Sequence, residues 1–184
     1  MGKLTFVLGG ARSGKSSYAQ RLAQASGKSV TFIATAQSLD EEMSARIQKH
    51  REDRPSEWIT LEIPQNIPAY LNSDPVNTDI YLLDCITLLA NNVFMQFIEE
   101  DRVNEDRAKL ALESEIDDLL AYIQKDSKDW IVISNEVGLG LVPPYQMGRV
   151  YRDLLGRANQ RLAHEADEVL WMVAGIAVPI QQFR

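Results

Sequence analysis

The sequence is poor in the residues that form disulfide bonds and zinc sites. Its 184 residues include one cysteine, Cys85, and two histidines, His50 and His164. A single cysteine excludes an intramolecular disulfide and a multi-cysteine zinc site. A chain of this length buries enough apolar surface to fold without such links, so we expect one domain spanning residues 1–184.

Long apolar runs and an excess of positive charge are also absent. No apolar stretch approaches the roughly 20 residues that a membrane-spanning helix needs, and no signal-peptide cleavage site follows the short apolar N-terminal run. The 19 Lys and Arg residues against 26 Asp and Glu residues give a net charge of −7. That charge disfavours a general attraction to nucleic acid or anionic membranes. A cytoplasmic enzyme or switch that does not bind nucleic acid is the expected class.

Apolar runs that alternate with amphipathic segments predict an α/β fold. Buried strands are predicted at residues 4–8, 30–34, 58–63, 80–83, 130–134 and 169–173. Helices are predicted at residues 16–25, 41–54, 86–100, 104–124 and 145–165. This order indicates three layers, with helices on both faces of a mostly parallel sheet. Residues 175–180 predict an antiparallel edge strand that tolerates Pro179, and residues 65–78 predict a polar surface loop.

One segment between the first strand and the first helix fits the phosphate-loop pattern G-x-x-x-x-G-K-[ST]. Its residues are Gly9, Gly10, Ala11, Arg12, Ser13, Gly14, Lys15 and Ser16. Glycines turn backbone N–H groups toward phosphate oxygens, and the helix N-terminus adds positive potential. We expect Lys15 to act catalytically on the β- and γ-phosphates of a bound nucleoside triphosphate and Ser16 to ligate Mg²⁺. With the three layers, this loop predicts a P-loop NTPase-type fold. The simpler interpretation is a glycine-rich strand–helix turn.

A second Mg²⁺ ligand is expected at the end of a neighbouring buried strand. Asp84 directly follows the apolar run at residues 80–83 and supplies such a carboxylate. The alternative is that Asp84 caps the helix predicted to start at Ile86. Cys85 is interpreted as a small packed side chain rather than a nucleophile.

A lone histidine in the predicted helix 41–54 has arginines on both sides. At 100° per residue, Arg46 and Arg54 lie about 40° to either side of His50. Two guanidinium groups would keep the imidazole neutral near pH 7, and a neutral imidazole facing a polyphosphate can act as a nucleophile or as an acid/base group. Met43 and Ile47 share this stripe, so a packed structural histidine is the alternative.

Further segments, taken with the phosphate loop and His50, make the pattern specific. They are residues 33–36, Arg54 and Pro55, Trp58, Glu62, residues 83–87, 135–138 and 156–160. Over essentially the whole chain, the sequence resembles the bifunctional adenosylcobinamide kinase/adenosylcobinamide-phosphate guanylyltransferase family of cobalamin biosynthesis. The resemblance implies phosphorylation of the aminopropanol hydroxyl of adenosylcobinamide with ATP or GTP. Transfer of GMP from GTP to the new phosphate then gives adenosylcobinamide-GDP and pyrophosphate.

The resemblance also implies roles for individual residues. His50 falls on the family's guanylylated histidine, and Lys49 stands where some members carry a second histidine. The nucleotide contacts implied beyond the phosphate loop are Ala34, Thr35, Ala36, Arg51, Glu52, Asp53, Arg54, Glu62 and Asp84. The family forms trimers, so a homotrimer is expected. The segment 135–143 is expected to form either a glycine-hinged loop near the corrinoid or a buried hydrophobic turn.

Two other function classes fit the phosphate loop alone. One is a monofunctional small-molecule kinase in which His50 is structural. The other is a non-enzymatic nucleotide-dependent switch. A guanine-specific GTPase is disfavoured, because the sequence contains no Asn-Lys-x-Asp segment.

Overall fold

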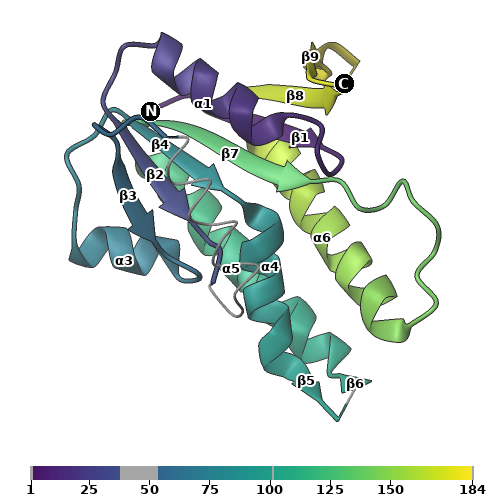
Figure 1. Ribbon diagram of the computed structural model, residues 1–184. Coiled ribbons are helices and arrows are strands. Elements are labelled where there is room, and N and C mark those ends of the chain that lie inside the picture. The colour runs from purple at the N-terminus through teal and green to yellow at the C-terminus, as the bar shows by residue number, and fades with distance from the viewer. Residues whose placement is uncertain (1, 38–53, 101, 184) are drawn as a thin grey trace.

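The computed structural model describes residues 2–37, 54–100 and 102–183, and its elements alternate along the chain as the sequence predicts (Figure 1). The strands are β1 (Leu4–Gly9), β2 (Val30–Ala34), β3 (Ile59–Glu62), β4 (Ile80–Asp84), β5 (Ile98–Glu99), β6 (Arg102–Val103), β7 (Asp129–Asn135), β8 (Glu168–Val173) and β9 (Ile176–Pro179). The helices are α1 (Lys15–Ala25), α3 (Ile67–Ser73), α4 (Ile86–Phe94), α5 (Glu105–Lys125) and α6 (Gln146–Glu165), with 3₁₀ turns η1 (Met95–Phe97) and η2 (Gln181–Phe183). Apart from Arg54, the helix predicted at 41–54 lies outside the described residues.

The strands form a seven-stranded sheet in the order β3-β2-β4-β7-β1-β8-β9. All neighbours are parallel except β8 and β9, which pair antiparallel with Leu170 opposite Pro179. The predicted mostly parallel sheet and antiparallel edge strand are both confirmed. The carboxyl ends of β1, β7, β4 and β2 therefore meet at one edge of the sheet, where ligands bind in open α/β folds.

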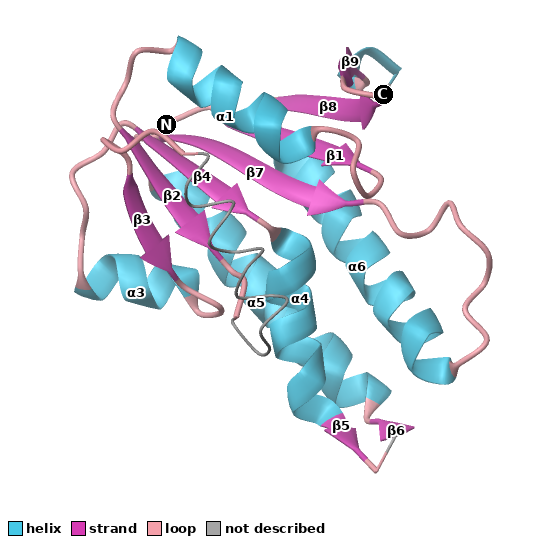
Figure 2. Cartoon of the chain, viewed as in Figure 1, coloured by secondary structure: helices cyan, strands magenta, loops and turns pink. Residues whose placement is uncertain are grey.

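Apolar side chains on the two faces of the sheet form two separate clusters. On one face α1 packs through Ala19 and Ala23. On the other face α3, α4, α5 and α6 cover the sheet, as Figure 2 shows. The strands are buried on both sides, which explains why they are continuous apolar runs in the sequence. These are the three expected layers, and no helix in the described part of the chain is long and apolar enough to cross a membrane.

The helix predicted at 86–100 is shorter than expected. It ends at Phe94, and after η1 the chain pairs β5 with β6 in a small hairpin, with Ile98 opposite Val103. Glu100 turns the chain with a φ of 45°. Ile98 and Val103 are β-branched and prefer extended backbone, and both pack on the core from this hairpin.

The segment predicted as a polar loop at 65–78 contains α3. Ile67 and Leu71 are buried and lie one helical turn apart, in a segment that is otherwise polar. Pro68 stands in the first turn of α3, where its missing N–H costs no hydrogen bond. The two prolines of this segment therefore did not exclude a helix.

Candidate active site

The phosphate loop, Gly9–Ser16, joins the end of β1 to the first turn of α1. Gly14 stands immediately before α1 with a φ of 93°, and Arg12 has a φ of 56°. Left-handed residues within a loop let successive backbone N–H groups converge on one point, and the helix N-terminus adds its positive potential. The backbone of this loop thus suits a phosphate group.

Lys15 lies folded over the loop rather than extended into solvent. Only 6% of it is exposed, and its Nζ donates hydrogen bonds to the Gly10 carbonyl at 2.6 Å and to Ser13 Oγ at 3.5 Å. Burial lowers the pKa of Lys15, while the neighbouring Cys85 and Asp84 oppose that shift. A cation is therefore held at the centre of the loop within electrostatic reach of Asp84.

Two glycines of the loop are required by the backbone beside them. A Cβ on Gly9 would lie 2.5 Å from the Met172 carbonyl oxygen on β8, and a Cβ on Gly14 would lie 3.3 Å from the Cα of Gly175. Gly175 also donates its backbone N–H to the Ser13 carbonyl at 2.9 Å. The turn between β8 and β9 thus supports the phosphate loop. Sequence analysis missed this contact, although a glycine between two apolar strands was a signal for it.

Asp84 ends β4 on the same face of the sheet as α1. Side chains alternate along a strand, and Leu82 belongs to the cluster beneath α1. The N-cap of α4 is Cys85, which follows Asp84 through a cis peptide bond. The interpretation of Asp84 as a helix cap is therefore wrong, whereas its role toward Mg²⁺ stays a prediction.

A buried hydrogen-bond network fixes the backbone around Asp84. Thr35 Oγ1 donates to the Cys85 carbonyl and accepts from the Cys85 N–H, both at 2.8 Å, and the Thr35 N–H donates to the Asp84 carbonyl at 3.2 Å. Asn92 Nδ2 donates to the carbonyls of Thr35 at 2.8 Å and Pro64 at 3.1 Å. Burial raises the pKa of Cys85 to about 12, so the thiol stays neutral and packs. Asn92 was not predicted as a site residue.

Ala34, Glu62 and Asp84 lie side by side at the ends of β2, β3 and β4. In the parallel registers Ala34 is opposite both Asp84 and Glu62. Ala36 follows two residues after β2. Three of the predicted nucleotide-binding positions are thus neighbours across the sheet. The fold brings them together from distant parts of the chain, since Thr35 and its hydrogen-bond partner Cys85 are 50 residues apart.

Arg54 packs on the strand that carries Ala34. Its guanidinium lies 3.6 Å from the centre of the Phe32 ring, and Nη1 donates to Thr60 Oγ1 at 3.5 Å. A groove along α1 is lined by Ser16 and other residues of α1, and by Arg54 and the three residues that follow it. The fold therefore brings Arg54 to the same groove as the last residue of the phosphate loop.

Four predicted site residues, His50, Arg51, Glu52 and Asp53, lie outside the described residues. Their predicted roles stay predictions.

The end of β7 lies beside the phosphate loop and is fixed by side chains from two helices. The Asn135 N–H donates to Thr87 Oγ1 at 2.8 Å, and its carbonyl accepts from Asn159 Nδ2 at 3.1 Å. The hydroxyl of Tyr151 donates to the Thr87 carbonyl at 2.8 Å. Thr87, Asn159 and Tyr151 were not predicted as site residues. Their partners are backbone atoms, which leave no spacing signal in the sequence.

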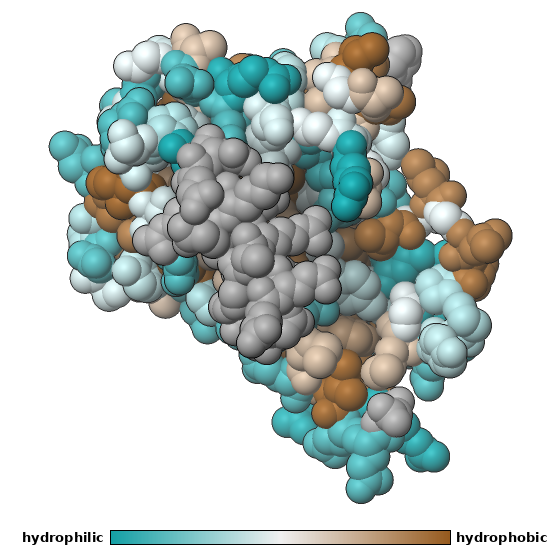
Figure 3. All heavy atoms as spheres, in the orientation of Figure 1, coloured by the Kyte–Doolittle hydropathy of each residue, from teal (hydrophilic) through white to brown (hydrophobic). Residues whose placement is uncertain are grey.

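After β7 the chain continues into what we call the apolar loop, residues 137–145. Its large side chains are exposed: Leu139 is 81%, Leu141 97% and Tyr145 76% accessible. Figure 3 shows apolar side chains gathered on this side of the molecule, where the loop projects in Figure 1. The alternative prediction of a buried hydrophobic turn is therefore wrong.

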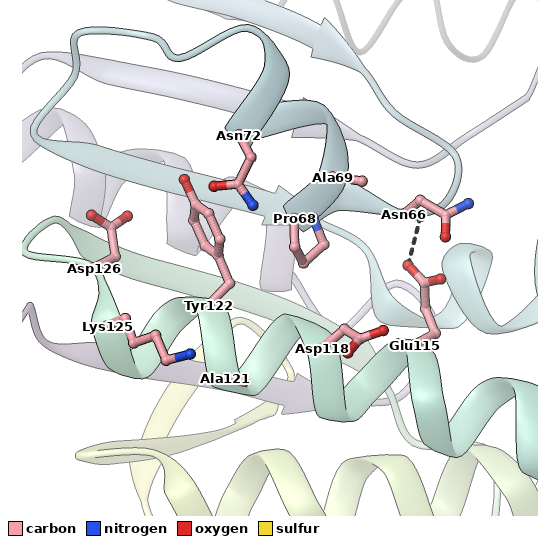
Figure 4. A pocket seen from close by; sticks show the side chains of 10 residues that line it. All are labelled: Asn66, Pro68, Ala69, Asn72, Glu115, Asp118, Ala121, Tyr122, Lys125 and Asp126. Carbon is pink, nitrogen blue, oxygen red and sulfur yellow. Dashed lines mark hydrogen bonds between the residues drawn. The ribbon is translucent and has the colours of Figure 1, made fainter.

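A second groove lies between α3 and α5, on the face of the sheet opposite α1 (Figure 4). Its walls carry Asn72, Asp118, Tyr122 and Lys125, and Glu115 accepts a hydrogen bond from the Asn66 N–H at 2.7 Å. Burial raises the pKa of Glu115, and the hydrogen bond from Asn66 opposes the shift. No residue of the phosphate loop lines this groove, so we place the chemistry at the other face.

A phosphate loop after the first strand of a mostly parallel sheet, with an acidic residue ending the strand two places away, defines a P-loop nucleotide-binding α/β protein. The comparisons with known proteins make this class specific. The family described as cobinamide kinase / cobinamide phosphate guanyltransferase matches residues 5–180, and the chain belongs to this family.

Relatives with curated names match the chain over almost its whole length. The bifunctional adenosylcobalamin biosynthesis protein CobU of Salmonella typhimurium is 41% identical over 97% of this chain and 99% of that protein. The Escherichia coli protein of the same name is 38% identical over the same shares. The corresponding protein CobP of Pseudomonas aeruginosa is 40% identical over 95% of each chain. Among solved structures, a RadB recombinase aligns with 17% identity and a TM-score of 0.46, covering 92% of this chain and 73% of that one.

Proposed function

We propose that this chain carries out both activities of its family at one nucleotide site. It phosphorylates the aminopropanol hydroxyl of adenosylcobinamide with ATP or GTP. It then transfers GMP from GTP to the new phosphate, which gives adenosylcobinamide-GDP and pyrophosphate. The observation that carries the proposal is Lys15, held inside the phosphate loop and within electrostatic reach of Asp84.

The side chains near Lys15 fit Mg²⁺. Ser16 offers a hydroxyl and Asp84 a carboxylate, and hard oxygen donors of this kind are the ligands that Mg²⁺ prefers. Within the described ranges no group of three or more His, Cys, Asp or Glu residues could hold a metal. Bound there with the nucleotide, Mg²⁺ would neutralise charge on the phosphates.

For the kinase step, the chain supplies positioning and positive charge. Lys15 exchanges its bond to the Gly10 carbonyl for a phosphate oxygen, and the loop N–H groups hold the phosphates in place. Negative charge that develops on the transferring phosphoryl group is stabilised by donors that are already oriented. Such stabilisation is the main source of catalysis in phosphoryl transfer.

For the guanylyl step, attack moves to the α-phosphorus of GTP. His50 forms a bond to that phosphorus while pyrophosphate leaves, and the phosphate of adenosylcobinamide phosphate then displaces the imidazole. Two displacements replace one difficult direct transfer. The resemblance assigns Arg51, Glu52, Asp53, Arg54 and Glu62 to nucleotide binding, and the stacked position of Arg54 beside the α1 groove supports that role for Arg54.

The same proposal includes the setting of the enzyme. We expect a single domain spanning residues 1–184, a homotrimer, a cytoplasmic location and no nucleic-acid partner. The family resemblance supports the trimer, and the net charge of −7 supports the absence of nucleic acid.

Mass spectrometry of the intact chain after incubation with GTP and Mg²⁺ tests this proposal. We expect one GMP bound to His50 through a bond that acid breaks and base spares. His50→Ala should lose the label and guanylyl transfer, yet keep part of the kinase activity, because γ-phosphoryl transfer needs no imidazole nucleophile. Kinase activity without any label would instead indicate a monofunctional kinase. Slow hydrolysis with no phosphorylated corrinoid would indicate a switch.

A further inference from the structure

The strand between the phosphate loop and Asp84 ends in an asparagine. β7 pairs with β1 on one side and β4 on the other, with Asn135 opposite Gly9 and Ile133 opposite Asp84. Asn135 is therefore two residues further along β7 than Ile133, the partner of Asp84, and it is level with Gly9 at the start of the phosphate loop. No other strand separates it from either.

The side chain of Asn135 belongs to the face of the sheet that α1 covers. Side chains two apart on a strand share a face, and Ile131 and Ile133 both belong to the cluster beneath α1. Asn135 is next in this series and is partly exposed. Lys15 begins α1 on the same face.

The backbone of Asn135 is held at both of its polar groups, by Thr87 at the N–H and by Asn159 at the carbonyl. The next N–H, that of Glu136, donates to the Gly9 carbonyl at 3.0 Å. No hydrogen bond to another described residue occupies the side-chain amide of Asn135. The fold thus fixes this position tightly and leaves the amide for a ligand.

We propose that Asn135 Nδ2 donates a hydrogen bond to the γ-phosphoryl group of the bound nucleoside triphosphate while that group is transferred. In this step the corrinoid hydroxyl oxygen bonds to the γ-phosphorus as the bond to the bridging oxygen breaks. The nucleoside diphosphate leaves with the electron pair, and the hydroxyl proton passes to water. A neutral amide dipole stabilises the oxygens of the transferring group without competing with Lys15 for charge. The inference rests on the proposed function, which places the triphosphate at the phosphate loop.

Steady-state kinase kinetics and nucleotide binding test this role. Asn135→Ala should lower the kcat of the kinase step by about 10²-fold, as for loss of one oriented donor. Affinity for ADP should stay unchanged, whereas affinity for a non-hydrolysable ATP analogue should fall. Asn135→Asp, which is nearly isosteric, should lower kcat further because its carboxylate repels the phosphate. Asn72→Ala, an exposed asparagine on α3, serves as the control and should match the unmodified chain.

A kcat for folded Asn135→Ala within about threefold of the unmodified chain would overturn the inference. A change confined to the KM for the corrinoid would also overturn it, since the amide would then bind the acceptor. If Asn135→Ala does not fold, Asn135→Asp decides by the same criteria. Lys15→Ala, measured in parallel, separates the two claims. If Lys15→Ala is inactive while the Asn135 variants stay active, only the inference about Asn135 is refuted. If Lys15→Ala is itself active, the proposed function is refuted.

Discussion

Two loops leave paired strands at the same edge of the sheet and are built in opposite ways. The phosphate loop after β1 is held by backbone contacts, with Gly9 against Met172, Ser13 bonded to Gly175, and Lys15 buried within the curve. The apolar loop after β7 exposes its leucines and its tyrosine almost completely. The phosphate loop begins at Gly9, which faces Asn135 in the register of β1 and β7, and the apolar loop begins two residues after Asn135.

The difference matches two kinds of ligand. A phosphate group is small and charged, so it is bound best by donors fixed before it arrives. Exposed apolar side chains grouped on one loop mark a surface that another molecule covers. We expect substitutions of the buried or closely packed residues of the phosphate loop to lower activity or stability. Substitutions in the apolar loop should leave stability nearly unchanged but weaken binding of the corrinoid.

The largest effect is expected at the rigid loop. Lys15→Ala removes the cation from the phosphate site and should lower the kinase rate by about 10²–10³-fold. The fold should persist, because the hydrogen bonds that this change removes run to Gly10 and Ser13 within the same loop. A kinase assay with thermal unfolding checks both statements. Lys28→Ala, an exposed lysine paired with Asp129, is the control.

The next effect measures how closely the rigid loop is packed. Gly9→Ala would place a Cβ 2.5 Å from the Met172 carbonyl oxygen, and relief of such crowding costs about 1–3 kcal/mol of unfolding free energy. Gly10→Ala meets nothing within 4 Å and should change stability by less than about 0.5 kcal/mol. Chemical denaturation of both variants makes the comparison. Equal stabilities would contradict the packing argument.

The third prediction concerns the acid that faces the rigid loop. Asp84→Asn keeps the shape of the side chain but removes its charge, so the variant should need about tenfold more Mg²⁺ for half-maximal activity. Since the N-cap of α4 is Cys85, helix stability should change little. A Mg²⁺ titration of kinase activity is the measurement, and an unchanged curve would remove Asp84 from the metal site.

The apolar loop gives a smaller effect of a different kind. Leu139→Ser combined with Leu141→Ser should change the unfolding free energy by less than about 0.5 kcal/mol, because both side chains are exposed. The KM for the corrinoid should rise several-fold with kcat nearly unchanged. Leu110→Ser, at a 66% exposed leucine on α5, is the matched control. An unchanged KM would mean that this loop does not contact the corrinoid.

The smallest effect lies far from both loops and tests whether the groove between α3 and α5 is structural. Burial raises the pKa of Glu115 above its usual 4.5, so the folded chain holds this proton more tightly than the unfolded chain. The folded state therefore loses stability as pH rises through that raised pKa. Glu115→Gln keeps an acceptor for the Asn66 N–H without the titration. Relative to this variant, the unmodified chain should lose stability as pH rises from 4 to 7 in denaturation experiments.

The parts of the molecule that depend on local sequence were predictable. Apolar strands, the phosphate loop at Gly9–Ser16 and the edge strand with Pro179 follow from runs, motifs and turn residues that lie within one segment. The short hairpin of β5 and β6 was missed because it has only two residues on each side. The cap assignment of Asp84 was wrong by one residue, which is within the usual uncertainty of helix boundaries.

What could not be predicted depends on partners that meet only in the folded chain. Asn92 contacts carbonyl groups from two separate loops, and Asn159 contacts the carbonyl of Asn135. An amide that binds a distant backbone atom has no preferred spacing from it, so these residues resemble any other asparagine on a helix. The same holds for the contact between Gly175 and Ser13.

That last contact joins two segments that lie far apart in the sequence. The phosphate loop is synthesised long before the turn that supports it through Gly175. The loop therefore cannot reach its final shape before Gly175 has been synthesised. We expect tight binding at the phosphate loop only once β8 and β9 have been added to the sheet.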